Sequence, residues 1–278
     1  MGDAVSDNIC FETDGAVAII TIDRFDEARN AISIPVGIEL YEALRRFERD
    51  EALSVAVLTG DGGVFCAGFD LKYYARIRSG EARGVAASEV PDGCHSMGPT
   101  RIVLDKPVIA AIEGYAVAGG LELACWCDMR VAARDAAFGV YCRRWGMPLA
   151  DGGTVRLTRI VGQGHALDMI LTGRGVSGDE AKQMGLVQRL TEPGRALEEA
   201  VALAQHIAAF PQGALRCDRR STLEQWCLPE LDAVTNEVRL AMSVYETDPI
   251  AHEQGVQGFV EGDGRHGRLA DGTEMSEL

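Results

Sequence analysis

The stretch at residues 113–124, EGYAVAGGLELA, decides the fold of this chain. The apolar run PVIAAI (107–112) leads into it, and the segment LELACWCDM (121–129), which has helical character, leads out of it. Two adjacent glycines therefore stand where a predicted strand gives way to a predicted helix. Glycine lets a backbone come close to a ligand, and the start of a helix exposes unpaired N–H groups. The stretch predicts a strand–loop–helix unit whose loop can present a backbone donor beside the carboxylate of Glu122.

A second loop of the same kind is GGVFCAGFDLKYY (62–74), which follows a strand predicted at 54–60. In α/β proteins, ligands bind beyond the carboxyl ends of the strands. One N–H group from each loop could converge on a single oxygen, which is the requirement for stabilising an oxyanion. Each loop taken alone also fits a tight turn with no ligand, so only the pair of loops favours a binding site.

The order of the predicted elements favours an α/β fold with parallel, buried strands. Strands are predicted at 16–24, 54–60, 105–114 and 129–133, with helices at 35–50 and 121–129. The later part of the chain is mainly helical, with helices predicted at 155–172, 179–185, 194–209, 229–246 and 249–261. Residues 75–100, rich in Arg, Gly, Ser and Glu, are predicted to form a mobile surface segment.

Composition and charge argue against several classes of protein. The chain has 278 residues and a net charge of −15 from 42 acidic and 27 basic residues, which argues against nucleic-acid binding because phosphate contacts need a basic face. No apolar run approaches the ~20 residues that span a bilayer, and the first residues lack the pattern of a signal peptide. We therefore expect a cytoplasmic protein with no membrane partner. The eight cysteines are irregularly spaced, which predicts mainly reduced thiols, and the five histidines follow no metal-binding spacing.

Several segments resemble the crotonase, or enoyl-CoA hydratase/isomerase, superfamily. CAGFDL (66–71) resembles its [AS]-x-G-x-D-[IL] loop, and EGYAVAGGLELACWCDMRVAA (113–133) resembles its signature segment. Further blocks resemble the superfamily in the same order, namely NAIS (30–33), GMPLADGGTVRLTRIVG (146–162) and LTGRGVSGDEAKQMGLVQRL (171–190). The resemblance is specific for the superfamily and leaves the reaction open.

The resemblance implies an α/β fold with a crotonase-type ββα spiral core at 1–195, which binds acyl-CoA, and a helical C-terminal region at 196–278 with an acidic tail. Members of the superfamily are commonly trimers, or hexamers formed by paired trimers. A homotrimer or homohexamer is therefore expected, with the C-terminal helices at its interface. Trp226 and the apolar faces of 229–246 are candidate contacts, and packing inside one subunit is the alternative.

The resemblance also implies roles for individual residues. The superfamily holds the thioester carbonyl of an acyl-CoA between two backbone N–H groups, which by position are those of Phe69 and Gly119. Glu122 matches a catalytic carboxylate, and its pKa is subject to opposing influences, because a helix N-terminus lowers it and apolar neighbours raise it. CoA is expected to lie along the matching positions Ala31, Ala67, Gly68, Asp70, Leu71, Lys72 and Gly120. No metal is expected, and no cofactor beyond the CoA of the substrate.

One catalytic position departs from the superfamily pattern. Hydratases carry a second glutamate where this chain has Cys142, and a thiol is a poor replacement for a carboxylate. We therefore expect Cys142 to be a packing residue, while residues 143–145 either line the acyl pocket or cap the sheet edge. Asp151 lies on a block where some isomerase-type members carry their acid, so it is either a substitute acid or a helix N-cap.

These residues fit isomerisation of a double bond better than hydration, because one carboxylate can lift and return a proton. Hydrolysis or decarboxylation of a CoA thioester would use the same pair of amides and stays open. Outside enzymes, the alternative is a non-catalytic acyl-CoA-binding protein.

Overall fold

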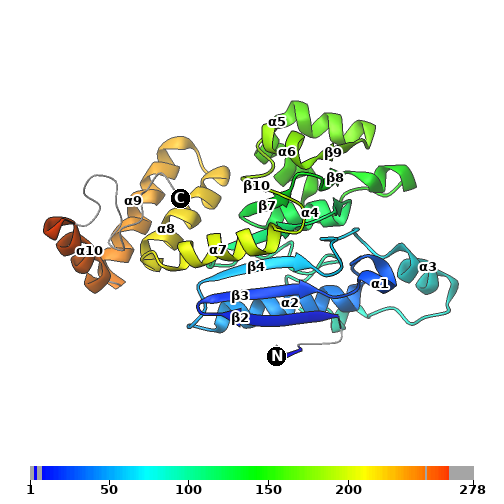
Figure 1. The fold of residues 1–278 in the computed structure, drawn as a ribbon, viewed down its shortest axis with the longest axis horizontal. Coiled ribbons are helices and arrows are strands. Elements are labelled where there is room, and N and C mark those ends of the chain that lie inside the picture. Colours follow the sequence, from blue (N-terminus) through cyan, green and yellow to red (C-terminus); the bar gives the residue numbers. More distant parts are fainter. Residues whose placement is uncertain (1–2, 5–7, 248, 263–278) are drawn as a thin grey trace. The chain divides into compact units, whose positions relative to one another are not determined.

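The computed structural model describes residues 3–4, 8–247 and 249–262. The chain forms two compact units, Met1–Ala209 and Phe210–Leu278, and each is described by itself. The first unit combines sheets and helices and the second is helical, so the predicted α/β fold with a helical C-terminal region is confirmed (Figure 1). The acidic tail expected at the C-terminus lies outside the described residues.

A mainly parallel sheet forms the base of the first unit. Among the described residues its strand order is β1 (Asp3–Ala4), β2 (Ile9–Asp14), β3 (Val17–Ile22), β4 (Val55–Gly60), β5 (Val108–Ile112), β7 (Met129–Ala133) and β10 (Arg189–Thr191). Neighbours from β3 onward are parallel, which confirms the parallel pairing predicted for β3, β4, β5 and β7. The prediction omitted β10 and β2. The latter pairs antiparallel with β3 across a turn in which Gly15 has a φ of +57°.

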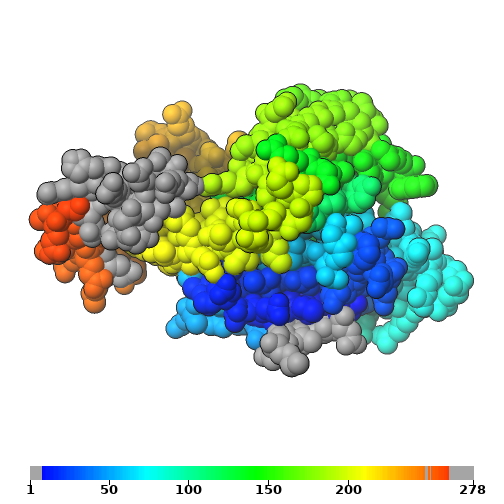
Figure 2. All heavy atoms as spheres, in the orientation of Figure 1, coloured from blue at the N-terminus to red at the C-terminus, as the bar shows by residue number. Residues whose placement is uncertain are grey.

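Successive side chains of a strand point to opposite sides of the sheet. Both faces of the central strands are buried, because helices cover the two sides. One face packs against α2 (Ile34–Arg49), which begins as predicted after Ser33 with Pro35 in its first turn. The other face packs against α7 (Ala196–Ala208), whose small residues Ala200 and Ala204 allow close approach. Figure 2 shows α7, in yellow, lying over this face of the sheet. The two faces together form the core that holds the ends of β4 and β5 in place.

A second, smaller sheet was not predicted from the sequence. It consists of β6 (Tyr115–Val117), β8 (Ala137–Gly139) and β9 (Gly175–Ser177), each only three residues long. Such short strands leave little periodicity in the sequence. Helices α4 (Gly119–Trp126) and α6 (Gly178–Gln183) contact this sheet, α5 (Gly153–Thr172) packs against α4, and the 3₁₀ turn η2 (Tyr141–Trp145) follows β8 in the chain. Since β6 leads directly into α4, the small sheet fixes where that helix begins.

The segment at 75–100 is only partly the surface segment that its composition predicts. It follows the short helix α1 (Phe25–Ala28) and α2 in the chain, and it contains most of α3 (Leu71–Ser79) and the 3₁₀ turn η1 (Ala87–Glu89). Its end turns inward, where Met97 is 0% and Thr100 1% exposed. The prediction of a mobile surface was therefore wrong for the end of the segment, because contacts with residues distant in sequence bury it.

The second unit contains α8 (Gln212–Glu224), η3 (Gln225–Cys227), α9 (Glu230–Thr247) and α10 (Pro249–Glu261). Of these, α8 was not predicted. Many large apolar side chains of this unit are exposed, including Leu231 at 79%, Phe259 at 77% and Trp226 at 52%. Within the described residues of the chain, no helix is both long and apolar enough to cross a membrane.

Candidate active site

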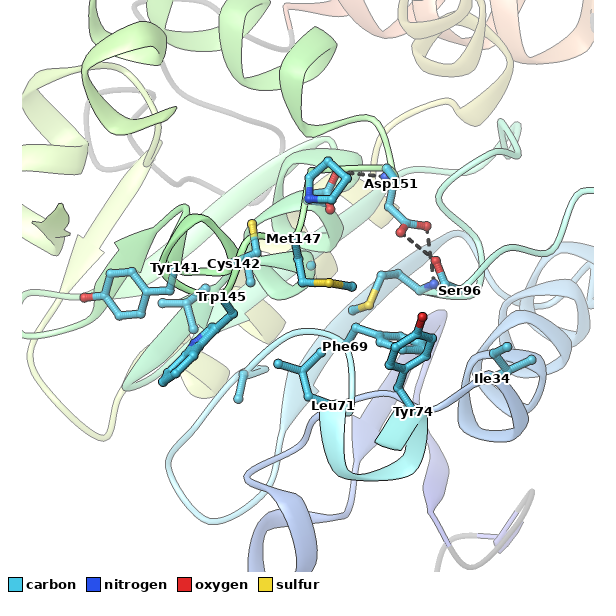
Figure 3. A pocket seen from close by; sticks show the side chains of 18 residues that line it. Ile34, Phe69, Leu71, Tyr74, Ser96, Tyr141, Cys142, Trp145, Met147 and Asp151 are labelled. Carbon is cyan, nitrogen blue, oxygen red and sulfur yellow. Dashed lines mark hydrogen bonds between the residues drawn. The ribbon is translucent and has the colours of Figure 1, made fainter. Parts of the chain in front are cut away.

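A pocket of about 440 Å³ opens beyond the carboxyl ends of β4 and β5. Both glycine-containing loops line it, as do the segments around Met97 and Met147. Figure 3 shows Tyr141 and Trp145 at one end, Phe69 and Met147 in the middle, and Asp151 and Ser96 at the other. Most of the lining is aromatic or aliphatic, and the carboxylates that line it are those of Glu122 and Asp151. An apolar cavity with a few polar groups is typical of a small-molecule site.

The first loop presents a backbone donor to this pocket region. Two hydrogen bonds to Ile32 flank Phe69, one from the N–H of Ile32 to the carbonyl of Gly68 (2.8 Å) and one from the N–H of Asp70 to the carbonyl of Ile32 (2.9 Å). In this pairing the N–H of Phe69 faces away from Ile32. It donates to no acceptor among the residues that the structure describes. An unpaired donor at a pocket is available to a ligand oxygen.

The second loop presents another donor at the start of α4. Ala118 has a φ of +53°, and its N–H donates to the carbonyl of Gly139 over 2.8 Å. This arrangement turns the next N–H, that of Gly119, out of the small sheet, and within the described part of the chain it meets no acceptor. Gly120 fits because its Cα lies against the first loop: a Cβ there would be 2.1 Å from the carbonyl oxygen of Cys66. The two loops are therefore packed in direct contact.

Glu122 lies in the first turn of α4 and is 3% exposed. Its Oε1 accepts the N–H groups of Asp151 and Gly153, each over 2.8 Å. Burial raises the pKa of Glu122, while these two N–H donors act in the opposite direction. Of the opposing influences expected from the sequence, desolvation is thus the stronger.

Asp151 is equally buried, at 5% exposure, but its surroundings are polar. Its Oδ1 lies 2.8 Å from Nδ1 of His95 and accepts from the hydroxyl of Thr100 (2.7 Å) and the N–H of Met97 (3.3 Å). Its Oδ2 accepts from the hydroxyl of Ser96 over 2.8 Å. Burial alone would raise the pKa of Asp151, but the hydrogen bonds from His95, Thr100 and Ser96 lower it.

The alternative interpretation of Asp151 as a helix N-cap is wrong. The N-cap of α5 is Gly152, and no side chain caps that helix. Gly152 has a φ of +94°, a conformation that favours glycine, and it turns the chain into the helix. The carboxylate of Asp151 is instead held by the segment at 95–100, as described above.

Cys142 lines the pocket where hydratases carry their second glutamate. Its side chain also packs against the core, and burial, followed by the charge of Glu122, raises the pKa of the thiol. A neutral thiol is a poor acid/base at neutral pH. Of the next residues, Trp145 lines the pocket, whereas Arg143 and Arg144 donate to the carbonyls of Ile170 (3.3 Å) and Gly173 (3.0 Å).

The positions expected to bind CoA lie together around the first loop. Ala67 and Leu71 line the pocket, and Lys72 is exposed beside them. Asp70 caps α3 by accepting the N–H of Tyr73 over 2.9 Å, and Arg24 lies 3.6 Å from its other oxygen. Arg24 also donates to the carbonyl of Ala31 over 2.6 Å. Asp70 thus has a structural role in the loop, and contacts of these residues with CoA remain a prediction.

The residues that surround Asp151 were not predicted from the sequence, namely His95, Ser96, Met97 and Thr100. They stand in a segment with no periodic pattern, so nothing in the sequence linked them to a site more than fifty positions away. In the described ranges, no cluster of three or more His, Cys, Asp or Glu side chains is suited to hold a metal ion.

The two sheets, the pair of contacting glycine loops and the buried glutamate in the first turn of α4 define a crotonase-type α/β protein. The family model described as enoyl-CoA hydratase/isomerase matches residues 12–266, and the chain belongs to this family. The resemblance inferred from the sequence motifs is thereby confirmed. The chain is accordingly an enzyme of the hydratase/isomerase family, which by itself leaves the exact reaction open.

Known relatives agree over almost the whole length. The chain is 36% identical over 257 residues to the enoyl-CoA hydratase EchA19 of Mycobacterium tuberculosis, covering 90% of this chain and 92% of the relative. It is 33% identical to the crotonyl-CoA hydratase of Syntrophomonas wolfei, covering 78% and 82%. The crystal structure of an enoyl-CoA hydratase from M. tuberculosis H37Rv superposes with a TM-score of 0.83 at 36% identity, covering 92% of this chain and 96% of that one.

Proposed function

We propose that this protein stabilises the enolate of an acyl-CoA thioester and moves a double bond along the acyl chain with Glu122 as its single acid/base. The observation that carries the proposal is the position of Glu122, buried in the pocket and packed beside two loops whose N–H groups at Phe69 and Gly119 have no acceptor among the described residues. Each part has a distinct task in the chemistry.

The two amides would hold the thioester oxygen. Removing a proton from the carbon next to the thioester carbonyl moves negative charge onto that oxygen. Fixed donors stabilise this charge more than they stabilise the ground-state carbonyl, and one such donor contributes about 3–4 kcal/mol. The contact between the loops, where a Cβ on Gly68 would be 3.0 Å from the nitrogen of Gly119, supports convergence of the two donors on one oxygen.

Glu122 would carry the proton. Its Oε1 is engaged by two N–H donors, which leaves Oε2 to take a proton from one carbon of the acyl group and return it to another. The pKa raised by burial favours this exchange, because an acid/base works best when its pKa lies near the working pH. Isomerisation needs one such group and no added water.

Hydration is the second candidate, because the relatives named above are hydratases by name. It would require a group that activates water where Cys142 stands, and the raised thiol pKa argues against Cys142 in that role. Asp151 as a second acid stays a prediction, although the lowered pKa of Asp151 does not favour it. Hydrolysis, decarboxylation and pure acyl-CoA binding remain alternative outcomes.

The proposal includes a homotrimer or homohexamer and the expected CoA contacts at Ala31, Ala67, Gly68, Asp70, Leu71, Lys72 and Gly120. The exposed apolar residues of α9 and α10 support an assembly, because large exposed apolar patches mark interaction sites. A monomer in light scattering at micromolar concentration would contradict it.

The reaction is tested with 3-enoyl- and 2-enoyl-CoA substrates in D₂O, with products followed by mass spectrometry. Isomerisation predicts a double-bond shift with no oxygen added to the product. Once the Glu122 carboxyl has exchanged with D₂O, deuterium enters at C4 in the 3-enoyl to 2-enoyl direction and at C2 in the reverse direction. A product heavier by one D₂O would favour hydration, and free CoA would indicate hydrolysis. No turnover by the wild type, with acyl-CoA binding intact, would identify a binding protein.

A further inference from the structure

The carboxylates of Asp151 and Glu122 are linked through a single peptide group. The backbone N–H of Asp151 donates to Oε1 of Glu122, while the side chain of the same Asp151 points the other way, to the segment at 95–100. Figure 3 shows the Asp151 side chain turned toward Ser96. The residue therefore joins a structural anchor to the group that would carry the proton.

We propose that Asp151 is a positioning residue that acts through Glu122: its carboxylate anchors the turn at 150–153, and the N–H groups of that turn fix Oε1 of Glu122 so that Oε2 faces the substrate. The inference rests on the proposed function, in which Glu122 is the acid/base. It assigns Asp151 a role different from the substitute acid that its position in the sequence suggests.

The side chain of Asp151 is held through both of its oxygens. Partners lie within hydrogen-bond distance of both oxygens: His95, Thr100 and Met97 at Oδ1, and Ser96 at Oδ2. Each oxygen of an ionised carboxylate offers about two acceptor sites, so the contacts at Oδ1 use its capacity, and Ser96 holds Oδ2. Taking up a proton at Oδ1 would weaken the bonds that the hydroxyl of Thr100 and the N–H of Met97 donate to this oxygen.

The backbone around Asp151 is held just as firmly. Arg156 donates to the carbonyl of Asp151 over 3.1 Å and to the carbonyl of Thr100 over 2.7 Å, so it ties the turn to the same segment that holds the side chain. Gly153 lies so close to Glu122 that a Cβ there would be 2.7 Å from its Cγ. A small rotation of the turn would therefore move Glu122 itself.

Two substitutions separate anchoring from acid catalysis. Asp151→Asn keeps the shape and an acceptor at Oδ1, and the Ser96 hydroxyl can reverse to accept from the new amide. Asp151→Ala removes both acceptors. If Asp151 only anchors the turn, the variant with an amide at this position should stay active and the variant with alanine should lose activity. If it transfers protons, both variants should be inactive.

We expect kcat of Asp151→Asn to stay within about threefold of wild type. The kcat of Asp151→Ala should fall at least about tenfold, because misplacing a catalytic group slows the chemical step, and its KM should change less than about threefold. In a Glu122→Gln background, Asp151→Ala should lower kcat by less than about a further twofold, since the effects of residues that act as a unit are not additive. Asp179→Ala, which removes an exposed surface aspartate, is the matched control.

A loss in Asp151→Asn as large as in Asp151→Ala would overturn the inference, and so would full additivity with Glu122→Gln. If Asp151→Ala does not fold, as judged by circular dichroism, Asp151→Asn alone decides between anchor and acid. Full activity of Glu122→Gln would instead reject the proposed function, so failure of the two proposals can be told apart.

Discussion

A Cβ atom added to Gly68 would lie 3.0 Å from the backbone nitrogen of Gly119. Phe69 and Gly119 are 50 positions apart in the sequence, yet their loops touch where each presents an N–H group without an acceptor in the described chain. Gly68 also has a φ of +100°, which residues with a side chain rarely adopt. The spacing of the two donors thus depends on this glycine.

Gly68→Ala should lower turnover at least about tenfold, because the methyl group pushes the two donors apart and misplaced groups lose catalysis steeply. Turnover is measured by deuterium incorporation and folding by thermal unfolding. Gly63→Ala is the matched control, since Gly63 also has a positive φ (+72°) but a Cβ there meets nothing within 4 Å. Equal losses of turnover in both variants would show that backbone strain, and not the loop contact, is responsible.

Glu122→Gln should reduce proton exchange by about 10²–10⁴-fold, the usual contribution of a general acid/base. Acyl-CoA binding, measured by calorimetry, should change little because glutamine keeps the acceptor for the N–H groups of Asp151 and Gly153. The exposed Glu192→Gln serves as the control. Turnover at the wild-type rate would exclude Glu122 as the acid/base.

The pH dependence follows from the raised pKa of Glu122. A base must be ionised to accept a proton, so kcat/KM should rise with pH through a pKa above the ordinary carboxyl value of about 4.3. A carboxyl whose pKa is raised on folding also destabilises the native state above that pKa, and stability increases as the pH falls through it. Glu122→Gln should therefore unfold at a higher temperature than wild type at neutral pH, and a lower one would contradict the burial argument.

Cys142 should be replaceable without loss of isomerisation. Because its thiol stays neutral, Cys142→Ser should keep kcat within about threefold of wild type. Cys142→Glu adds a second carboxylate to the pocket, and it should increase the ratio of hydration to isomerisation, measured from product masses. Strong loss of activity in Cys142→Ser would reveal a catalytic role for the thiol.

The apolar pocket should favour acyl groups longer than crotonyl. Each additional buried methylene contributes about 0.8 kcal/mol, which corresponds to about a fourfold lower KM until the pocket of about 440 Å³ is filled. Steady-state kinetics with a series of enoyl-CoA substrates of about four to twelve carbons tests this. The binding free energy should improve by about 0.8 kcal/mol per methylene. A KM independent of chain length would show that the acyl group lies outside the pocket.

Much of the fold could be predicted because it rests on local patterns. The apolar runs that became β3, β4, β5 and β7 and the amphipathic stretch that became α2 each form one element over consecutive residues. The motifs also identified both glycine loops and Glu122, because loops that follow parallel strands meet at one edge of the sheet. The three-residue strands β6, β8 and β9 were missed, since they are too short to leave a pattern.

The sequence by itself determined the family, the parallel pairing of the strands and the two loops that carry the unpaired amides, since glycines and apolar runs act on their own neighbourhoods in the chain. Only the tertiary structure decided the direction in which the pKa of each carboxylate shifts. Burial raises the pKa of Glu122, whereas hydrogen bonds from His95, Thr100 and Ser96 lower the pKa of Asp151. The reason is physical: desolvation and hydrogen bonding depend on which distant residues are brought into contact, and no local pattern records those contacts.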